Sequence, residues 1–326
     1  MNNETIFHSF LKDSLQGFVD EKKAIGYSFA KGESLLKQFD KVVTSLPQDI
    51  DMLTKDLVMK WTERRPEEAT STQLGRISLM RGLAEYMNRM GNTAYVYPKA
   101  MVTVERYSYT PYIFTEKEIA SIFTVCDDFA ISYQSPNRHL VLSLIFRILY
   151  GCGLRISEAV NLTIADVNLK EGIIFIKNTK FNKERTIPIA DTLRNRCIEY
   201  NRLVNTGKPE TSYFFPSPLG GHYKSNTIYI LFRQILWAAN ISHTGKGPRL
   251  HDLRHTFAVH CLKKWVLGNR DITNCIPYLS AYLGHEDLRG SQHYLRLTAD
   301  LYPDIIDKVE KNCSWLIPEV NWDESY

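Results

Sequence analysis

Three side chains have the types and spacing needed to hold a phosphate group and move a proton beside it. Arg155 stands in the run 153–158, Gly-Leu-Arg-Ile-Ser-Glu, at a predicted helix start, where the helix dipole and free N–H groups favour an anion. Its planar guanidinium can bind two phosphate oxygens. His251 and Arg254 are three residues apart and share one face of a predicted helix, so one could exchange a proton while the other holds a phosphate. We expect the adjacent His255 to be a packing residue.

A tyrosine and a basic turn supply two further candidate groups. Tyr294 follows the run Tyr282-Leu-Gly-His285 by nine residues. A tyrosine hydroxyl is a weak nucleophile until a base and cations assist it. The basic segment 180–185 lies between two predicted strands, where a lysine can project into a groove and donate a proton. A lone tyrosine among 18 in the chain, or a charged turn, also fits a purely structural role.

Four amphipathic helices are predicted in residues 1–91, because apolar residues recur there at spacings of three and four. Thr54 is expected to cap the third helix, over 55–64, and Gly91 to follow the fourth, over about 72–90. The apolar positions of the first two helices are Phe7, Phe10, Leu11, Leu15, Phe18 and Val19, then Leu35, Leu36, Phe39, Val42, Val43 and Leu46.

The remaining residues predict a second, mixed domain that positions the candidate groups. The run 115–118 forms a capping box, and a long apolar helix begins near Pro136 and ends at 151–153. Segments 172–177 and 185–189 predict a β-hairpin, with Pro188 marking a sheet edge. Further helices are predicted over 191–206, 225–239, 252–266, 272–283 and 301–312. The fold class is therefore mainly α with a small β-sheet, in three parts: a helical domain over 1–97, a linker over 98–113 and a mixed α/β domain over 114–326.

Composition and charge restrict the setting in which this chemistry occurs. The chain of 326 residues is 44% hydrophobic and 23% charged, which excludes global disorder. It has no apolar run long enough for a transmembrane helix and no signal peptide at its start. Six cysteines without a C-x-x-C pair indicate reduced thiols in the cytoplasm rather than a zinc site or disulfides. The net charge is +4, which permits but does not indicate nucleic-acid binding, and the basic excess lies in 154–208 and 240–296.

The order and spacing of these groups resemble the tyrosine recombinase (phage integrase) family. The resemblance covers 112–326, and the N-terminal helices are similar in size and position to that family's core-binding domain. The residues that it carries over as catalytic are Arg155, Lys180, His251, Arg254, His285 and Tyr294. The run K-F-N-K-E-R matches the family pattern K-G-N-K-E-R, with Phe181 in place of Gly, and Lys177 and Lys183 remain alternatives to Lys180.

The resemblance implies DNA cleavage by a covalent route. Tyr294 would attack a DNA phosphate to form a 3′-phosphotyrosine while the two arginines hold its nonbridging oxygens. His285 would add a hydrogen bond, His251 would act as acid and base near the nucleophile, and Lys180 would protonate the leaving 5′-oxygen. Glu158 either orients a neighbouring group or is a carboxylate on the helix surface. No cofactor and no metal is expected, since the chain has no P-loop and no metal-ligand spacing of acidic or histidine residues.

Several alternatives remain open at the level of sequence. The expected partners are double-stranded DNA at specific core sites and further copies of the chain, with a tetramer on paired sites and no membrane. The biological role is integration and excision of a mobile element, or resolution of chromosome or plasmid dimers. A related type IB topoisomerase activity and a non-enzymatic DNA-binding protein are the competing classes. The tail beyond Tyr294 either docks on a neighbouring protomer or folds back on its own domain. No arm-binding domain is evident before Thr5, which favours a two-domain recombinase.

Overall fold

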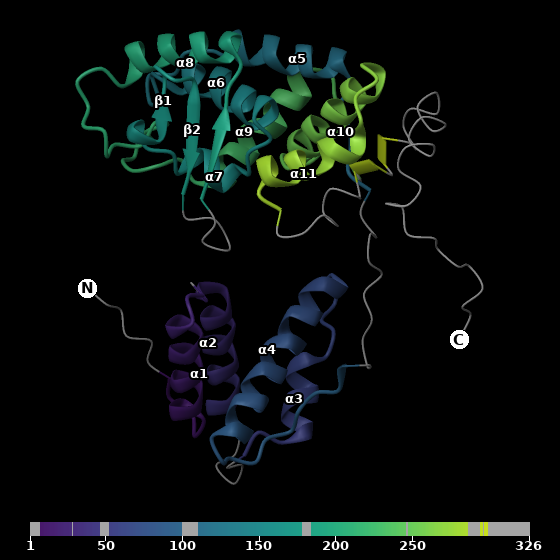
Figure 1. Ribbon diagram of the computed structural model, residues 1–326. Coiled ribbons are helices and arrows are strands. Elements are labelled where there is room, and N and C mark those ends of the chain that lie inside the picture. The colour runs from purple at the N-terminus through teal and green to yellow at the C-terminus, as the bar shows by residue number, and fades with distance from the viewer. Residues whose placement is uncertain are drawn as a thin grey trace. The chain divides into compact units, whose positions relative to one another are not determined.

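The chain forms two compact units, Met1–Ser108 and Tyr109–Tyr326, which are coloured from purple to yellow in Figure 1. The computed structural model describes residues 7–27, 29–45, 52–99, 110–177, 184–245, 247–285, 294–295 and 297–298. The predicted helix at 301–312 and the C-terminal tail therefore lie outside the described residues.

The first unit is built from helices, and its described elements are α1 (Lys12–Ala24), α2 (Ala30–Thr44), α3 (Lys55–Thr62) and α4 (Thr70–Arg89). Thr54 caps α3 as predicted, since its hydroxyl accepts a hydrogen bond from the backbone N–H of Leu57. Gly91 follows the end of α4 with a φ of +87°, a left-handed conformation that glycine adopts without steric cost. The helices predicted from apolar spacing are thus present, with ends that differ by a few residues.

The core of the first unit forms where the apolar faces of the four helices meet, around Leu15, Leu36, Phe39, Val58 and Met80. Two predicted core positions are wrong. Phe10 is 42% exposed, although Phe7 and Leu11, which also precede α1, are buried, and Val42 on α2 is 38% exposed. At these two positions the spacing of apolar residues did not indicate burial.

The second unit combines helices with a small sheet. Its described helices are α5 (Glu116–Asp127), α6 (Arg138–Gly151), α7 (Ile156–Val160), α8 (Asp191–Val204), α9 (Ser225–Ala238), α10 (Asp252–Leu267) and α11 (Ile272–Leu283). The predicted capping box opens α5: Thr115 accepts from the backbone N–H of Glu118, and the Glu118 carboxylate accepts from the backbone N–H of Thr115. The fold class predicted from the sequence, mainly α with a small sheet, is confirmed.

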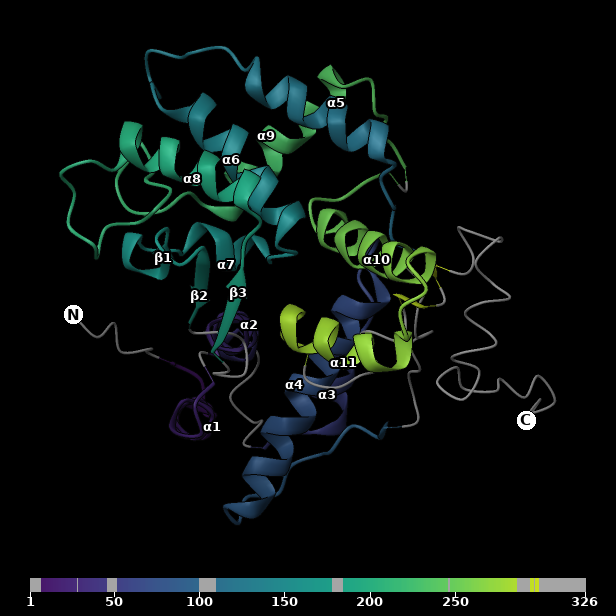
Figure 2. The same cartoon turned by 45° about the horizontal axis from the view of Figure 1, so that its top comes forward.

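Three antiparallel strands form the sheet in the order β1 (Val167–Asn168), β2 (Ile173–Ile176) and β3 (Arg185–Pro188). The predicted hairpin is confirmed, and its strands β2 and β3 lie side by side in Figure 2. Ile173 is opposite Pro188, and Ile176 is opposite Arg185. Pro188 lies on the edge strand β3, where its missing N–H costs no hydrogen bond within the sheet. Strand β1 was not predicted, because two residues are too short to show an alternating pattern.

Helix α6 lies at the centre of the main core of the second unit, in contact with α5, α8 and α10. Val141, Leu142, Ile145 and Phe146 are fully buried there. A second apolar cluster joins α10 and α11 to Tyr294, Leu295 and Leu297. This cluster fixes the short segment that contains Tyr294 against the helix that contains His251 and Arg254. None of the helices in the described part of the chain is both long and apolar enough to cross a bilayer.

Candidate active site

Arg155 stands at the N-cap of α7, as predicted, and its side chain is one-third exposed. The turn before it needs Gly153, whose φ is +58° and where a Cβ would lie 2.6 Å from a ring carbon of Phe257. Arg155 Nη1 donates to Glu158 Oε1 at 2.8 Å, and Nη2 donates to the carbonyl of Gly284 at 3.3 Å. The Arg155 guanidinium therefore connects the start of α7 to Gly284, the residue that follows α11.

Glu158 lies between two arginines and is almost fully buried, with 6% of its side chain exposed. Arg185, the first residue of β3, donates to both carboxylate oxygens at 3.0 and 2.8 Å. Burial by itself would raise the pKa of Glu158, but the hydrogen bonds and charges of Arg185 and then Arg155 lower it overall below its ordinary value. Of the two sequence-based interpretations of Glu158, the geometry agrees with a carboxylate that orients a neighbour.

Arg254 lies inside α10 with 2% of its surface exposed. Its two terminal nitrogens donate to the carbonyls of Gly153 at 2.7 Å and Leu283 at 2.6 Å. Burial, followed by the charge of Arg155, lowers the pKa of Arg254 to about 10, so the guanidinium stays charged at neutral pH. The backbone carbonyls at 153, 283 and 284 thus hold two arginines that are 99 positions apart in the sequence.

His251 is the N-cap residue of α10 and precedes Arg254 by one helical turn. Burial lowers the pKa of His251 to about 4, and the charges of Arg254 and Arg155 contribute in the same direction. The imidazole is therefore neutral at neutral pH, a form that can both donate and accept a hydrogen bond.

Tyr294 is 3% exposed, and its hydroxyl lies 3.1 Å from Nδ1 of His255. Burial raises the pKa of Tyr294 above its ordinary value, while the charge and hydrogen bonding of Arg254 partly offset this rise. The ring of His285 stacks on the tyrosine ring, with centroids 5.9 Å apart and planes 23° apart. The arrangement thus brings Arg254, His285 and Tyr294 together.

His255 is the clearest difference between sequence and structure at this site. The sequence analysis predicted a packing role, whereas its ring nitrogen contacts the tyrosine hydroxyl. The spacing of four residues between His251 and His255 was the available signal, because it places both rings on one face of α10. The sequence predicted Arg185 only as part of the basic turn and the strand after it, and no local signal indicates its pairing with Glu158.

Lys180 and Lys183 lie outside the described residues, so the general acid that the sequence analysis predicted stays a prediction. The third candidate, Lys177, has its Nζ 2.6 Å from Asp166 Oδ1. The hydrogen bond that Lys177 donates to Asp166 raises the pKa of Lys177 and favours its charged form. An ammonium held by a carboxylate is a poorer proton donor than a free one, which disfavours Lys177 for this role.

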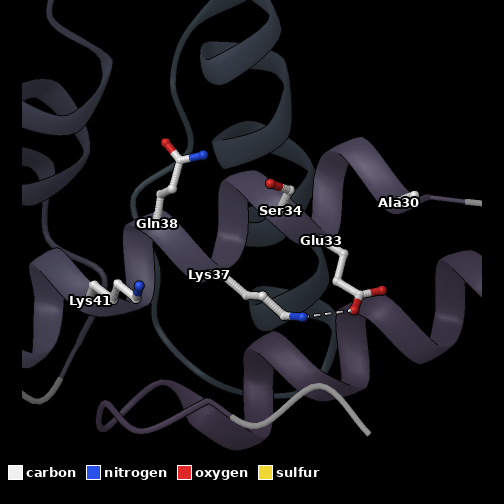
Figure 3. Close-up of a pocket in the computed structure, with 6 residues that line it drawn as sticks. All are labelled: Ala30, Glu33, Ser34, Lys37, Gln38 and Lys41. Atoms are coloured by element: carbon white, nitrogen blue, oxygen red, sulfur yellow. Dashed lines mark ion pairs between the residues drawn. The ribbon is translucent and has the colours of Figure 1, made fainter. Parts of the chain in front are cut away.

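A separate hollow lies on the first unit, along α2 (Figure 3). Its lining residues are Ala30, Glu33, Ser34, Lys37, Gln38 and Lys41. Lys37 and Lys23 both pair with Glu33, with Nζ to carboxylate distances of 3.4 and 2.8 Å. One helix supplies every lining residue, so the hollow is a polar helix face. In the described part of the chain no group of three or more His, Cys, Asp or Glu residues is arranged to hold a metal ion.

The family model described as the phage integrase family matches residues 113–300, which include all six predicted catalytic positions. The chain belongs to this family. Two relatives illustrate the range of its members. The protein y4rB of Sinorhizobium fredii, provisionally named an integrase/recombinase, is 28% identical over 313 residues, which cover 93% of this chain and 98% of y4rB. The tyrosine recombinase XerA of Pyrococcus horikoshii is 30% identical over 203 residues, 61% of this chain and 62% of XerA.

Solved structures of other recombinases have the same fold as this integrase-family chain. XerH, in a post-cleavage complex with a palindromic difH substrate, gives a TM-score of 0.61 at 19% identity, over 86% of this chain and 78% of XerH. A lambda integrase dimer bound to a COC′ core site gives 0.61 at 15% identity, over 90% and 78%. Together with the family match and the tyrosine recombinase relatives, this identifies the protein as a site-specific recombinase enzyme of the tyrosine type.

Proposed function

We propose that this recombinase cuts and rejoins double-stranded DNA at specific core sites through a 3′-phosphotyrosine at Tyr294. The observation that supports the proposal is the convergence of Arg155 and Arg254 on the backbone of 283–284, beside the buried tyrosine hydroxyl. Two fixed guanidiniums are suited to the negative charge that develops on a phosphate under attack. His285, stacked on the nucleophile, would donate to the same phosphate.

The cleavage step moves one bond at phosphorus. Tyr294 gives up its hydroxyl proton to a neighbouring histidine, and its oxygen forms the new bond to phosphorus. The bond to the 5′-oxygen breaks, and the 5′-oxygen takes a proton from Lys180. His251, whose role implied by the family resemblance is that of acid and base near the nucleophile, enters the step neutral. Religation reverses these events with the 5′-hydroxyl of the second strand as the attacking group, so no external energy source is needed.

The experiment that tests the nucleophile compares Tyr294→Phe with Tyr282→Phe. The DNA is a duplex selected from a random-sequence pool by binding to the protein, with a nick that lets the leaving fragment diffuse away. Tyr282 is the control, because it is partly buried in the same unit and its hydroxyl donates to the carbonyl of Pro188. Loss of the covalent adduct in Tyr294→Phe alone, on a denaturing gel, agrees with the proposal. An adduct that survives Tyr294→Phe refutes the assignment of the nucleophile.

The role of Lys180 is tested by changing the leaving group of the DNA substrate. Lys180→Ala should slow cleavage of a normal 5′-oxygen substrate by about 10²-fold or more and leave a 5′-thio substrate nearly unaffected, since a thiolate departs without a proton. Equal slowing of both substrates would assign Lys180 to DNA positioning instead. If neither substrate slows, Lys183 is the next candidate for the acid.

The first unit, with domain bounds of 1–97, is proposed to be the core-binding domain, followed by the linker 98–113 and the catalytic domain 114–326. The polar face of α2 supports this role, because exposed Lys37 and Lys41 can contact a phosphate backbone. Replacing both lysines with glutamine should weaken DNA binding and flatten its dependence on salt, measured by fluorescence anisotropy. An unchanged salt dependence would assign the contacts to another face.

We further propose integration and excision of a mobile element as the biological role, in the cytoplasm, by a tetramer on paired sites. The relative y4rB, which is named an integrase/recombinase, supports this role, because its match covers 93% of this chain. Truncation after Thr298 should leave a protein that binds one site but does not pair two sites on a native gel. A truncated protein that still pairs sites and exchanges strands would refute docking of the tail on a neighbouring protomer.

A further inference from the structure

His255 contacts the atom that would attack DNA. Its Nδ1 lies 3.1 Å from the Tyr294 hydroxyl oxygen, and the two ring centroids are 5.5 Å apart. Tyr294 is held by the apolar cluster of α10 and α11, and His255 is on α10 itself, so both partners belong to one packed region. The contact places Nδ1 within reach of the hydroxyl proton, as a proton transfer requires.

The tyrosine needs a proton acceptor at this position. Burial raises the pKa of its hydroxyl above the ordinary value, so almost all of it is protonated at neutral pH. Arg254 stabilises the phenolate that forms, but a guanidinium has no lone pair with which to take the proton. An imidazole nitrogen at hydrogen-bond distance has the lone pair that can take the proton.

His251 is less suited to receive this proton. Burial and the charges of Arg254 and Arg155 oppose the protonated form of His251. Its ring meets the ring of His255 edge to face, with centroids 4.8 Å apart, so the two histidines occupy neighbouring positions along α10. This arrangement divides their roles: His251 faces the arginines that would hold the phosphate, and His255 faces the nucleophile.

We propose that His255 is a catalytic residue that accepts the proton of Tyr294 and returns it on religation, an inference that rests on the function proposed above. In cleavage the hydroxyl proton passes to Nδ1 of His255, and the phenolate oxygen uses the freed electron pair to bond to phosphorus. The bond to the 5′-oxygen breaks, and that oxygen receives a proton from the general acid. In religation the imidazolium returns its proton to the departing tyrosine oxygen, so the enzyme ends unchanged.

The chain offers a matched control on the same helix. His260 Nδ1 lies 2.9 Å from the hydroxyl of Tyr150, with ring centroids 6.0 Å apart. This pair joins the same two atoms, an imidazole Nδ1 and a tyrosine hydroxyl, but it lies between α10 and α6, and both of its residues are partly buried. Substitutions at His260 therefore reproduce the structural cost of losing a Tyr–His pair without touching Tyr294.

The test measures single-turnover formation of the covalent adduct with the selected, nicked duplex. Asparagine keeps a hydrogen-bond acceptor near the position of Nδ1 but cannot take a proton at neutral pH. We expect His255→Asn and His255→Ala to slow adduct formation by about 10²- to 10⁴-fold, and His260→Asn by about twofold or less. Restoration of the wild-type rate by asparagine would mean that His255 only positions the hydroxyl and would overturn the proposal, as would an unaffected His255→Ala.

A second measurement needs no DNA. With 3-fluorotyrosine in place of tyrosine, the ¹⁹F resonance of residue 294 is identified by its absence in Tyr294→Phe. His255→Asn should shift this resonance, and His260→Asn should shift that of residue 150 instead. A resonance of residue 294 that His255→Ala leaves in place would overturn the contact on which the inference depends.

The two proposals fail in different ways. If wild type forms no adduct, or Tyr294→Phe still forms one, the proposed function is wrong and the inference falls with it. If wild type forms the adduct through Tyr294 and His255→Asn is equally fast, only the inference about His255 is wrong.

Discussion

Glu158→Gln removes the negative charge that holds two arginines beside the predicted active site. The carboxylate accepts four hydrogen bonds, from the backbone N–H and Nη1 of Arg155 and from Nη1 and Nη2 of Arg185. Each oxygen accepts two of them. Glutamine keeps one carbonyl oxygen, so the donors that face the other position meet an NH₂ group, and both guanidiniums lose their counter-charge.

The expected cost follows from the burial of this group. Breaking a buried ion pair on one side costs about 3–5 kcal/mol, because it leaves an uncompensated charge. Arg155 is one-third exposed, and water can replace part of its lost contact, so we expect about 3 kcal/mol for Glu158→Gln. In a domain of this size, about 2–4 °C of Tm accompanies each kcal/mol, which gives a decrease of about 6–12 °C.

Differential scanning calorimetry of the full chain measures this change, with Asp127→Asn as the control. Asp127 also binds an arginine through both oxygens, with Arg147 nitrogens at 2.8 and 2.7 Å, but 38% of its side chain is exposed. Exposed pairs contribute about 0–1 kcal/mol, so its Tm should decrease by about 4 °C or less. Equal decreases in the two variants would refute the argument from burial.

The pH dependence of this contribution has a defined sign. The folded-state pKa of Glu158 is lowered, so its stabilising effect is complete above the unfolded pKa and is lost as the pH falls through the folded value. The difference in Tm between wild type and Glu158→Gln should therefore be constant from neutral pH down to about 5 and decrease below about 4. A difference that grows on acidification would contradict the assignment.

Three further predictions concern the turn, the cap and the cysteines. Gly284→Ala should destabilise the protein by at least about 1–2 kcal/mol, since φ is +66° and a Cβ would lie 2.8 Å from Nη1 of Arg185; an unchanged Tm would contradict this. Thr115→Ala should cost about 1 kcal/mol in chemical denaturation by removing the cap from Glu118, and Thr115→Ser should restore most of it; equal effects of alanine and serine would argue against the cap. Burial raises the pKa of three thiols to about 12, so iodoacetamide at neutral pH should modify them only after denaturation, as mass spectrometry can show; rapid modification in the native state would contradict their burial. These thiols are Cys126, Cys152 and Cys197.

Helices and their caps were predictable because they depend on residues close in sequence. Apolar spacing located α1 to α4, and threonine hydroxyls at 54 and 115 marked two helix starts. Helix α2 begins differently, after Phe29 with a φ of +46° and no side-chain cap, and no sequence rule anticipates that start. The exposure of Phe10 was also unpredictable, since the spacing of apolar residues does not show which of them another part of the chain covers.

The sequence by itself determined the chemical types at the site: two arginines, two histidines and a tyrosine in a fixed order. Each is recognisable because its neighbours in the chain form a motif. What only the tertiary structure decided is which groups touch. Glu158 meets Arg185 across 27 residues, and His255 meets Tyr294 across 39. Such contacts arise when the packing of α10, α11 and β3 brings distant backbone segments together, and no local pattern encodes that distance. For this reason His255, which was predicted to be a packing residue, lies at hydrogen-bond distance from the Tyr294 hydroxyl.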